Sequence, residues 1–127
     1  MTTHQVLING QWQESDSSGT FQANDPKAAA PIPEDYPISS WAECESALNV
    51  ATACFEKLRS TPRADIAKFL DTYADRIDAR SDEIRAMAAL ETALPLDTRL
   101  VGELGRTSGQ LRQAAAGARS ALSLIHI

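Results

Sequence analysis

The sequence is poor in the residues that bind metal ions or form disulfides. It has two histidines and two cysteines in 127 residues. Cys44 and Cys54 fall in one expected helix, where ten residues at 1.5 Å each separate them by about 15 Å, too far for a disulfide. His4 and His126 offer neither the ligand number nor the spacing of a metal site. We therefore expect no metal and no intramolecular disulfide.

An excess of basic residues is also missing. Twelve Lys and Arg stand against seventeen Asp and Glu, and the net charge is -5. Nucleic acids and anionic membranes attract clustered Lys and Arg, so we expect neither as a partner. No stretch approaches the roughly 18 apolar residues of a membrane helix, and no charged start leads into an apolar run. The composition, 43% hydrophobic, predicts a packed cytoplasmic protein.

The first forty residues carry the signals of extended chain. Asn9-Gly10 lies between two short alternating runs and is typical of a two-residue hairpin turn, which predicts a hairpin over 5–14. Pro26 should end regular pairing, because proline lacks the N–H that a strand donates. The other expected segments are a polar loop over 15–19, a short strand over 20–23 and an extended, proline-rich connection over 27–37.

From Ser40 the apolar residues recur every three or four positions, which predicts helices. Ser40 and Glu43 have the spacing of a capping box, and Thr61-Pro62 is typical of a helix start. The four expected helices span about 40–59, 62–80, 82–92 and 97–119. In the second helix we expect a buried stripe made of Ile66, Phe69, Leu70, Tyr73 and Ile77.

The fourth helix has an unusual distribution of glycine. Its apolar side consists of Leu100, Leu104, Ser108, Leu111 and Ala115. Gly102, Gly105 and Gly109 form a separate stripe, although each costs up to about 1 kcal/mol relative to alanine in a helix. Glu103, Arg106 and Gln110 lie beside this stripe. The pattern fits a helix that packs on one side and approaches something closely on the other, or equally a solvated polar face that includes glycines.

The order of these features resembles the start of aldehyde dehydrogenases. The shared features are Leu7-Ile-Asn-Gly-Gln-Trp12, the Asp25-Pro26 turn, and Tyr36-Pro-Ile-Ser-Ser40 leading into a helix. Glu91-Thr-Ala-Leu-Pro95 and Gly102-Glu-Leu-Gly-Arg-Thr-Ser-Gly-Gln-Leu-Arg112 resemble the branch of α-ketoglutaric semialdehyde and NADP-dependent fatty aldehyde dehydrogenases. Ala93 stands where this family usually has glycine, Leu104 where it usually has arginine, and Lys27-Ala-Ala-Ala30 replaces its usual Ala-Thr-Gly-Glu.

The resemblance implies an α/β aldehyde dehydrogenase-like fold of which residues 1–121 are the N-terminal part, with an incomplete Rossmann-like coenzyme domain. It also implies a homo-oligomeric parent enzyme that oxidises an aldehyde with NADP or NAD. The family's nucleophilic cysteine and its other catalytic and cofactor-binding residues come later in the chain, so we expect none here. Because the fourth helix borders the substrate channel in this family, Arg106 and Gln110 are candidates to meet a polar group of the substrate. The alternative, at least equally favoured, is a structural role in which Arg106 pairs with a carboxylate elsewhere in the full enzyme.

Cys44 and Cys54 are better interpreted as buried or half-buried small apolar residues than as nucleophiles, because no histidine lies near either.

Residues 122–127 do not resemble the family and look like a translated transposase adapter, so we expect an artefactual tail there. The apolar stripes of the helices are of the kind that packs on a parallel sheet, and we expect that sheet to lie outside this chain. We therefore predict that the fragment alone is only marginally stable. The alternative is a small helical interaction module without catalysis, although it leaves the hairpin and the glycine-rich motif without a role.

Overall fold

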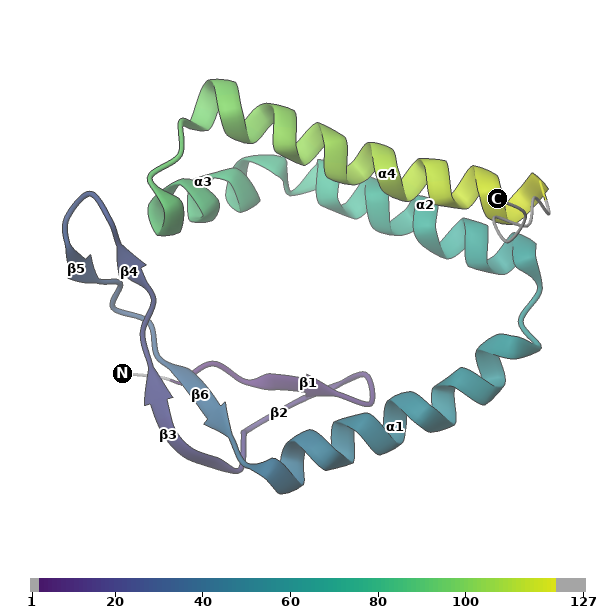
Figure 1. The fold of residues 1–127 in the computed structure, drawn as a ribbon, viewed down its shortest axis with the longest axis horizontal. Coiled ribbons are helices and arrows are strands. Elements are labelled where there is room, and N and C mark those ends of the chain that lie inside the picture. The colour runs from purple at the N-terminus through teal and green to yellow at the C-terminus, as the bar shows by residue number, and fades with distance from the viewer. Residues whose placement is uncertain (1–2, 121–127) are drawn as a thin grey trace, which may run out of the picture. The chain divides into compact units, whose positions relative to one another are not determined.

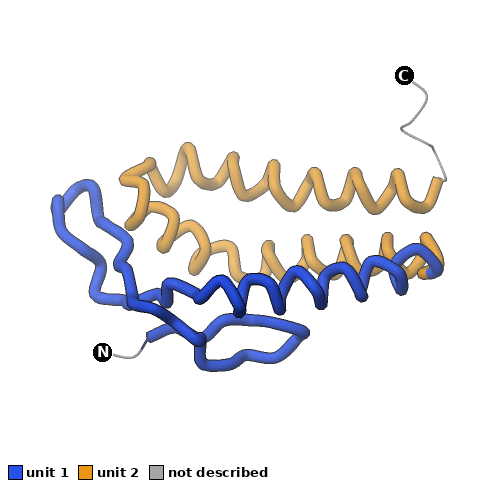
Figure 2. The backbone as a smooth tube through the Cα atoms, turned by 60° about the horizontal axis from the view of Figure 1, so that its bottom comes forward, with its two compact units in different colours: residues 1–60 blue, residues 61–127 orange. Residues whose placement is uncertain are grey.

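The computed structural model describes residues 3–120, which divide into two compact units at Ser60 (Figures 1 and 2). The first unit contains short strands followed by one helix, and the second contains helices alone. The elements of the first unit are β1 (Val6–Ile8), β2 (Gln11–Gln13), β3 (Ser17–Phe21), β4 (Asn24–Asp25), β5 (Ala30–Pro31), β6 (Tyr36–Ser39) and α1 (Trp41–Arg59). Those of the second are α2 (Arg63–Ala79), α3 (Ser81–Thr92), the π-helical turn η1 (Leu96–Leu100) and α4 (Val101–Ser120).

The expected N-terminal hairpin is present. β1 and β2 pair antiparallel with Leu7 opposite Trp12. The turn residues Asn9 and Gly10 both have positive φ, 54° and 73°, as a type I′ turn requires. The side chains of Leu7 and Trp12 are 54% and 66% exposed, so this strand pair leaves its largest apolar residues uncovered.

The strands that follow differ from the sequence-based expectation. The segment 15–19, expected as a loop, contributes to β3, and β6 forms inside and beyond the expected connection 27–37. β3 pairs with β6 antiparallel, with an irregularity between Ser17 and Thr20, and β4 pairs with β5. Each described sheet has two strands. Every strand is thus an edge, and β5 and β6 can hold Pro31 and Pro37 without losing a central ladder hydrogen bond.

α1 begins at a network of hydrogen bonds that ties it to the strands. The Ser40 side chain accepts a bond from the Glu43 backbone N–H at 3.2 Å, as in a capping box. The Glu43 carboxylate, however, accepts from the Ser15 hydroxyl at 2.6 Å and from the Asp16 N–H at 3.1 Å. Only half of the expected capping box therefore forms, because the Ser40 N–H donates to the Asp16 carbonyl instead. Hydrogen bonds from Ser15 first, then from Ser39 and the Asp16 backbone, hold the pKa of Glu43 below its ordinary value.

The second unit is built on the packing of α2 against α4, which lie side by side in Figure 1. The residues that this packing buries are small: Ala67, Ala74 and Ala115 are fully buried, and Ser108 is 3% exposed. Ala67 and Ala74 are seven residues apart on α2, as are Ser108 and Ala115 on α4, so each pair falls on one face of its helix. Small side chains on facing helices allow the two axes to approach closely.

This packing corrects the expected burial of α2. Phe69 and Tyr73, which were expected in a buried stripe, are 66% and 50% exposed, while Ala67 and Ala74 take the buried positions. Along η1 and α4, by contrast, the expected apolar side is the one that faces inward, with Leu100 of η1 and Ser108 and Ala115 of α4 all buried. The other three residues of the expected stripe, Ile66, Leu70 and Ile77, are half-buried. Phe69 and Tyr73 lie outside the contact because the partner helix approaches along the alanine face. None of the helices in residues 3–120 qualifies as a membrane span.

Ion pairs fix the register of α2 and α4. Arg112 of α4 donates to Asp75 and to Asp78, each at 2.7 Å, and Arg119 pairs with Asp71. Because the later residue of α4 meets the earlier residues of α2, the two helices run antiparallel. The hydrogen bonds from Arg112 and Ser108 hold the pKa of the Asp78 carboxyl below its ordinary value of 3.8.

Ala93 and Ala29 adopt a left-handed backbone conformation, and both stand at positions where this sequence differs from the family pattern. Ala93, the C-cap of α3, has φ 58°, and Ala29, in the turn between β4 and β5, has φ 51°. Ala93 and the third residue of the Lys27-Ala-Ala-Ala30 run both stand where the resemblance places glycine. The Cβ of an L-residue crowds the carbonyl oxygen in this conformation, at a cost of roughly 1–2 kcal/mol.

Replacement of Ala93 by glycine should therefore stabilise the chain by about 1 kcal/mol, the strain removed less the greater backbone entropy of glycine. Chemical denaturation of the two proteins measures the difference. Ala86, exposed in the middle of α3, supplies the control, because A86G should destabilise by about 1 kcal/mol. Equal destabilisation by both substitutions would contradict the left-handed assignment of Ala93.

The stability of the second unit should fall at acid pH. Because the folded pKa of Asp78 lies below its ordinary value, its contribution is complete above pH 3.8 and is lost as the pH falls through the folded pKa. The D78N variant lacks this contribution already, so urea unfolding from pH 7 down to pH 2.5 should give it a shallower pH dependence than the wild type. An E91Q control, at an exposed position near the end of α3, should keep the wild-type slope.

Candidate functional site

The candidate site lies on the outer face of α4. It contains Arg106 and Gln110, the two residues that the family resemblance suggests as substrate contacts. The helix begins from η1, in which the Arg99 and Leu100 N–H groups both donate to the Pro95 carbonyl. A π-helical turn of this kind changes the direction in which the following side chains project. Arg106 and Gln110 lie one turn apart on α4 and both are exposed, on a surface free to meet another group.

The glycine stripe beside them borders open space. A Cβ added to Gly102, Gly105 or Gly109 would meet no heavy atom within 4 Å. These glycines are therefore not needed for packing within the second unit, whose own side chains leave the backbone of α4 uncovered along this stripe. Nothing in the second unit packs closely on these glycines, so both interpretations from the sequence stay open: close approach by another group, and a solvated face.

Glu103 links two arginines at the start of this face. Its Oε2 lies 2.6 Å from Nη2 of Arg106, and its Oε1 lies 2.7 Å from Nη2 of Arg99. The Glu103 side chain is 30% exposed, whereas those of Arg99 and Arg106 are 62% and 68% exposed. From the sequence, Glu103 is only a neighbour of the glycines, without a role of its own. The signal was present, because spacings of three and four on a helix bring opposite charges together.

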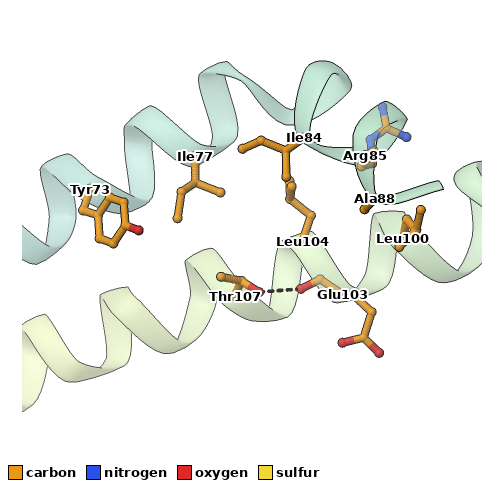
Figure 3. A pocket seen from close by; sticks show the side chains of 9 residues that line it. All are labelled: Tyr73, Ile77, Ile84, Arg85, Ala88, Leu100, Glu103, Leu104 and Thr107. Atoms are coloured by element: carbon orange, nitrogen blue, oxygen red, sulfur yellow. Dashed lines mark hydrogen bonds between the residues drawn. The ribbon is translucent and has the colours of Figure 1, made fainter. Parts of the chain in front are cut away.

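A groove of about 340 Å³ opens on the other side of the same helix (Figure 3). α2 contributes Tyr73 and Ile77, α3 contributes Ile84, and the side chains of Ile84 and Leu104 point toward one another across it. Figure 3 also shows the Glu103 carboxylate directed away from the groove, while the Thr107 hydroxyl donates to the Glu103 carbonyl at 2.9 Å. Arg85 and Glu103 are the charged residues of its lining, which is otherwise mainly apolar, so the groove is suited to apolar contact.

The two cysteines lie far along the chain from this face, on α1 of the first unit. Cys44 is half-buried, as expected, and Cys54 is exposed, which corrects the expectation for that residue. Cys54 is exposed because nothing in the first unit covers the second half of α1, where residues 51–59 are all exposed. Among residues 3–120 no group of three or more His, Cys, Asp or Glu is placed to hold a metal ion.

Comparison with known proteins places most of the chain in a family. Residues 12–124 match the sequence model of the aldehyde dehydrogenase family. The chain belongs to the aldehyde dehydrogenase family. It is 39% identical over 111 residues to "Alpha-ketoglutaric semialdehyde dehydrogenase 2" of Azospirillum brasilense, a match that covers 87% of this chain and 21% of the relative. The corresponding enzyme of Acinetobacter baylyi is 41% identical over 70 residues, which cover 55% of this chain and 13% of that protein.

Solved aldehyde dehydrogenases share the fold. Succinate-semialdehyde dehydrogenase from Burkholderia pseudomallei superposes with a TM-score of 0.81 at 28% identity, covering 91% of this chain and 24% of that one. An NADP-dependent enzyme from Bacillus halodurans (TM-score 0.82, 23% identity) and an NAD-dependent one from Sinorhizobium meliloti (0.83, 24%) cover 91% and 94% of the chain, and 24% of their own length in each case. The chain thus spans about a quarter or less of the aldehyde dehydrogenases it matches.

The open space beside the glycines yields a prediction for the isolated chain. G105A should increase the stability of α4 by up to about 1 kcal/mol, because alanine is the better helix former and its methyl group meets nothing. Denaturation followed by circular dichroism measures the gain. Ala114, exposed on the same helix, provides the reverse control A114G, which should lose a similar amount. A loss of stability in G105A would mean that the glycine face is covered in the chain.

Proposed function

We propose that the chain forms the N-terminal part of an NAD(P)-dependent aldehyde dehydrogenase that oxidises an aldehyde carrying a carboxylate to the corresponding diacid. α-Ketoglutaric semialdehyde is the substrate we favour. The observation that carries the proposal is the 39% identity, over 87% of the chain, to a protein named for that substrate. The Burkholderia neighbour, named for another semialdehyde that bears a carboxylate, supports the same substrate class.

Within this enzyme we assign Arg106 and Gln110 to the substrate channel. Both side chains are exposed on α4, and the glycines beside them leave room for a close approach. A guanidinium binds a carboxylate through two parallel charge-assisted hydrogen bonds, which suits Arg106 to the acid end of such a substrate. The amide of Gln110 can donate to or accept from a neighbouring oxo group.

Catalysis and cofactor binding belong to parts of the enzyme outside the described residues. Pyrophosphate is held where a glycine-rich turn leads from a strand into a helix N-terminus. The one direct strand-to-helix passage within residues 3–120, from β6 through Ser40 into α1, has no glycine, so we assign no contact with NADP or NAD to this part. The resemblance places the nucleophilic cysteine later in the family sequence. We infer that the 127-residue chain alone has no dehydrogenase activity.

The remaining features of the whole protein follow the family in our proposal. Residues 1–121 are family sequence, and the expected artefactual tail, 122–127, lies outside the described residues. The enzyme acts as a homo-oligomer in the cytoplasm, and the uncovered Leu7 and Trp12 of the hairpin fit a contact with another segment. The family match over residues 12–124 argues against the alternative, a separate helical interaction module.

A chimera tests the proposal directly. Residues 4–120 of this chain replace the matching segment of the Azospirillum α-ketoglutaric semialdehyde dehydrogenase 2, and cofactor reduction is followed at 340 nm. We expect the chimera to oxidise α-ketoglutaric semialdehyde, while the 127-residue chain and the Azospirillum enzyme without the segment are both inactive. A soluble, folded chimera of the relative's oligomeric size that oxidises no aldehyde would contradict the proposal, as would activity of the isolated chain.

A further inference from the structure

One carboxylate holds two arginines on the face of α4 that we assign to the substrate. Glu103 contacts Arg106 through Oε2 at 2.6 Å and Arg99 through Oε1 at 2.7 Å. Each arginine thus uses one of its Nη atoms for Glu103. A guanidinium has five N–H donors, so most donors of Arg106 stay available to a ligand. The side chain of Glu103 is the least exposed of the three, and its backbone carbonyl is itself held by the Thr107 hydroxyl at 2.9 Å.

We propose that Glu103 is a positioning residue that fixes the guanidinium of Arg106 for the carboxylate of the substrate. A free arginine side chain samples many rotamers and loses that freedom when it binds. An arginine already held by Glu103 has lost part of this freedom before the substrate arrives, so binding costs less. The inference rests on the proposed function, because it takes Arg106 to meet the substrate.

The charges of Arg99, Glu103 and Arg106 make the positioning role of Glu103 testable, because it predicts a change of KM opposite in direction to that of a purely electrostatic role. Arg99, Glu103 and Arg106 together carry a net charge of +1, and E103Q raises it to +2. If Glu103 acts only through its charge, its removal should strengthen the attraction for an anionic substrate. If Glu103 acts by holding Arg106, its removal should weaken binding despite the added positive charge. The two roles therefore predict changes of KM in opposite directions.

The experiment uses the chimera with two substrates of similar size, α-ketoglutaric semialdehyde and the neutral aldehyde pentanal. We expect E103Q to raise KM for the acid aldehyde about tenfold, the scale of a charged hydrogen bond, with kcat nearly unchanged and pentanal unaffected. R106Q should raise the same KM at least as much. E103D, which keeps the charge on a shorter side chain, should lie between wild type and E103Q.

The matched control is E83Q. Glu83 pairs with Arg80 at the same spacing of three, with 2.5 Å between Oε1 and Nη2, at the start of α3 and outside the proposed site. E83Q should change neither KM. An unchanged KM in R106Q would contradict the proposed role of Arg106. If R106Q raises KM while E103Q lowers it or leaves it unchanged, the proposed function stands and the positioning role fails. An equal change for both aldehydes in E103Q would also overturn it, in favour of a structural role.

A second measurement serves if the E103Q chimera does not fold. In the 127-residue chain, NMR exchange reports rotation of the Arg106 guanidinium about its Nε–Cζ bond. E103Q should accelerate this rotation, and E83Q should leave it unchanged while accelerating that of Arg80. Equal rotation rates of Arg106 in wild type and E103Q would overturn the positioning role, because Glu103 would then hold nothing.

Discussion

The close approach of α2 and α4 is the constraint on which the second unit depends. Ala67, Ala74 and Ala115 are fully buried, and any larger side chain at these positions would push the helices apart, at a typical cost of 1–3 kcal/mol. Arg112 and Arg119 then fix which turn of α4 faces which turn of α2. Because the axis and register of α4 are set in this way, so is the outward direction of its opposite face, where Glu103 and Arg106 lie.

The same packing explains why so much apolar surface is left uncovered. A seam of alanines buries little area, and Phe69 and Tyr73 lie outside it. On α1, Trp41 is 76% exposed and Leu48 and Phe55 are 60% and 57% exposed. Apolar side chains at seven-residue intervals on one helix face are typical of a surface that packs on another layer. The chain spans only about a quarter of the solved structures whose fold it shares, which is consistent with such a layer lying in the rest of those proteins.

Local signals in the sequence predicted the elements that local physics determines. The Asn9-Gly10 turn needs only two residues that tolerate positive φ, and the helices need only periodicity, caps and prolines. β3 and β6 were not predicted as a pair because their pairing joins residues about twenty apart, such as Ser17 and Ser39, and no local pattern specifies it. The half-formed capping box at Glu43 has the same origin, since Ser15 and Asp16 reach the carboxylate from the connection between β2 and β3.

The candidate site shows a similar division. Arg106 and Gln110 were found through resemblance to a family, because an exposed arginine on a helix has no distinctive chemistry of its own. The link from Glu103 to Arg106 and Arg99 could have been predicted from spacing alone. Residue spacing does not specify which side of α4 faces α2. That orientation depends on the buried alanines of α2. A helix that packs through small residues can present charged groups and bare backbone on one face while its other face is fixed, and this combination suits α4 to hold an arginine in place beside an open approach.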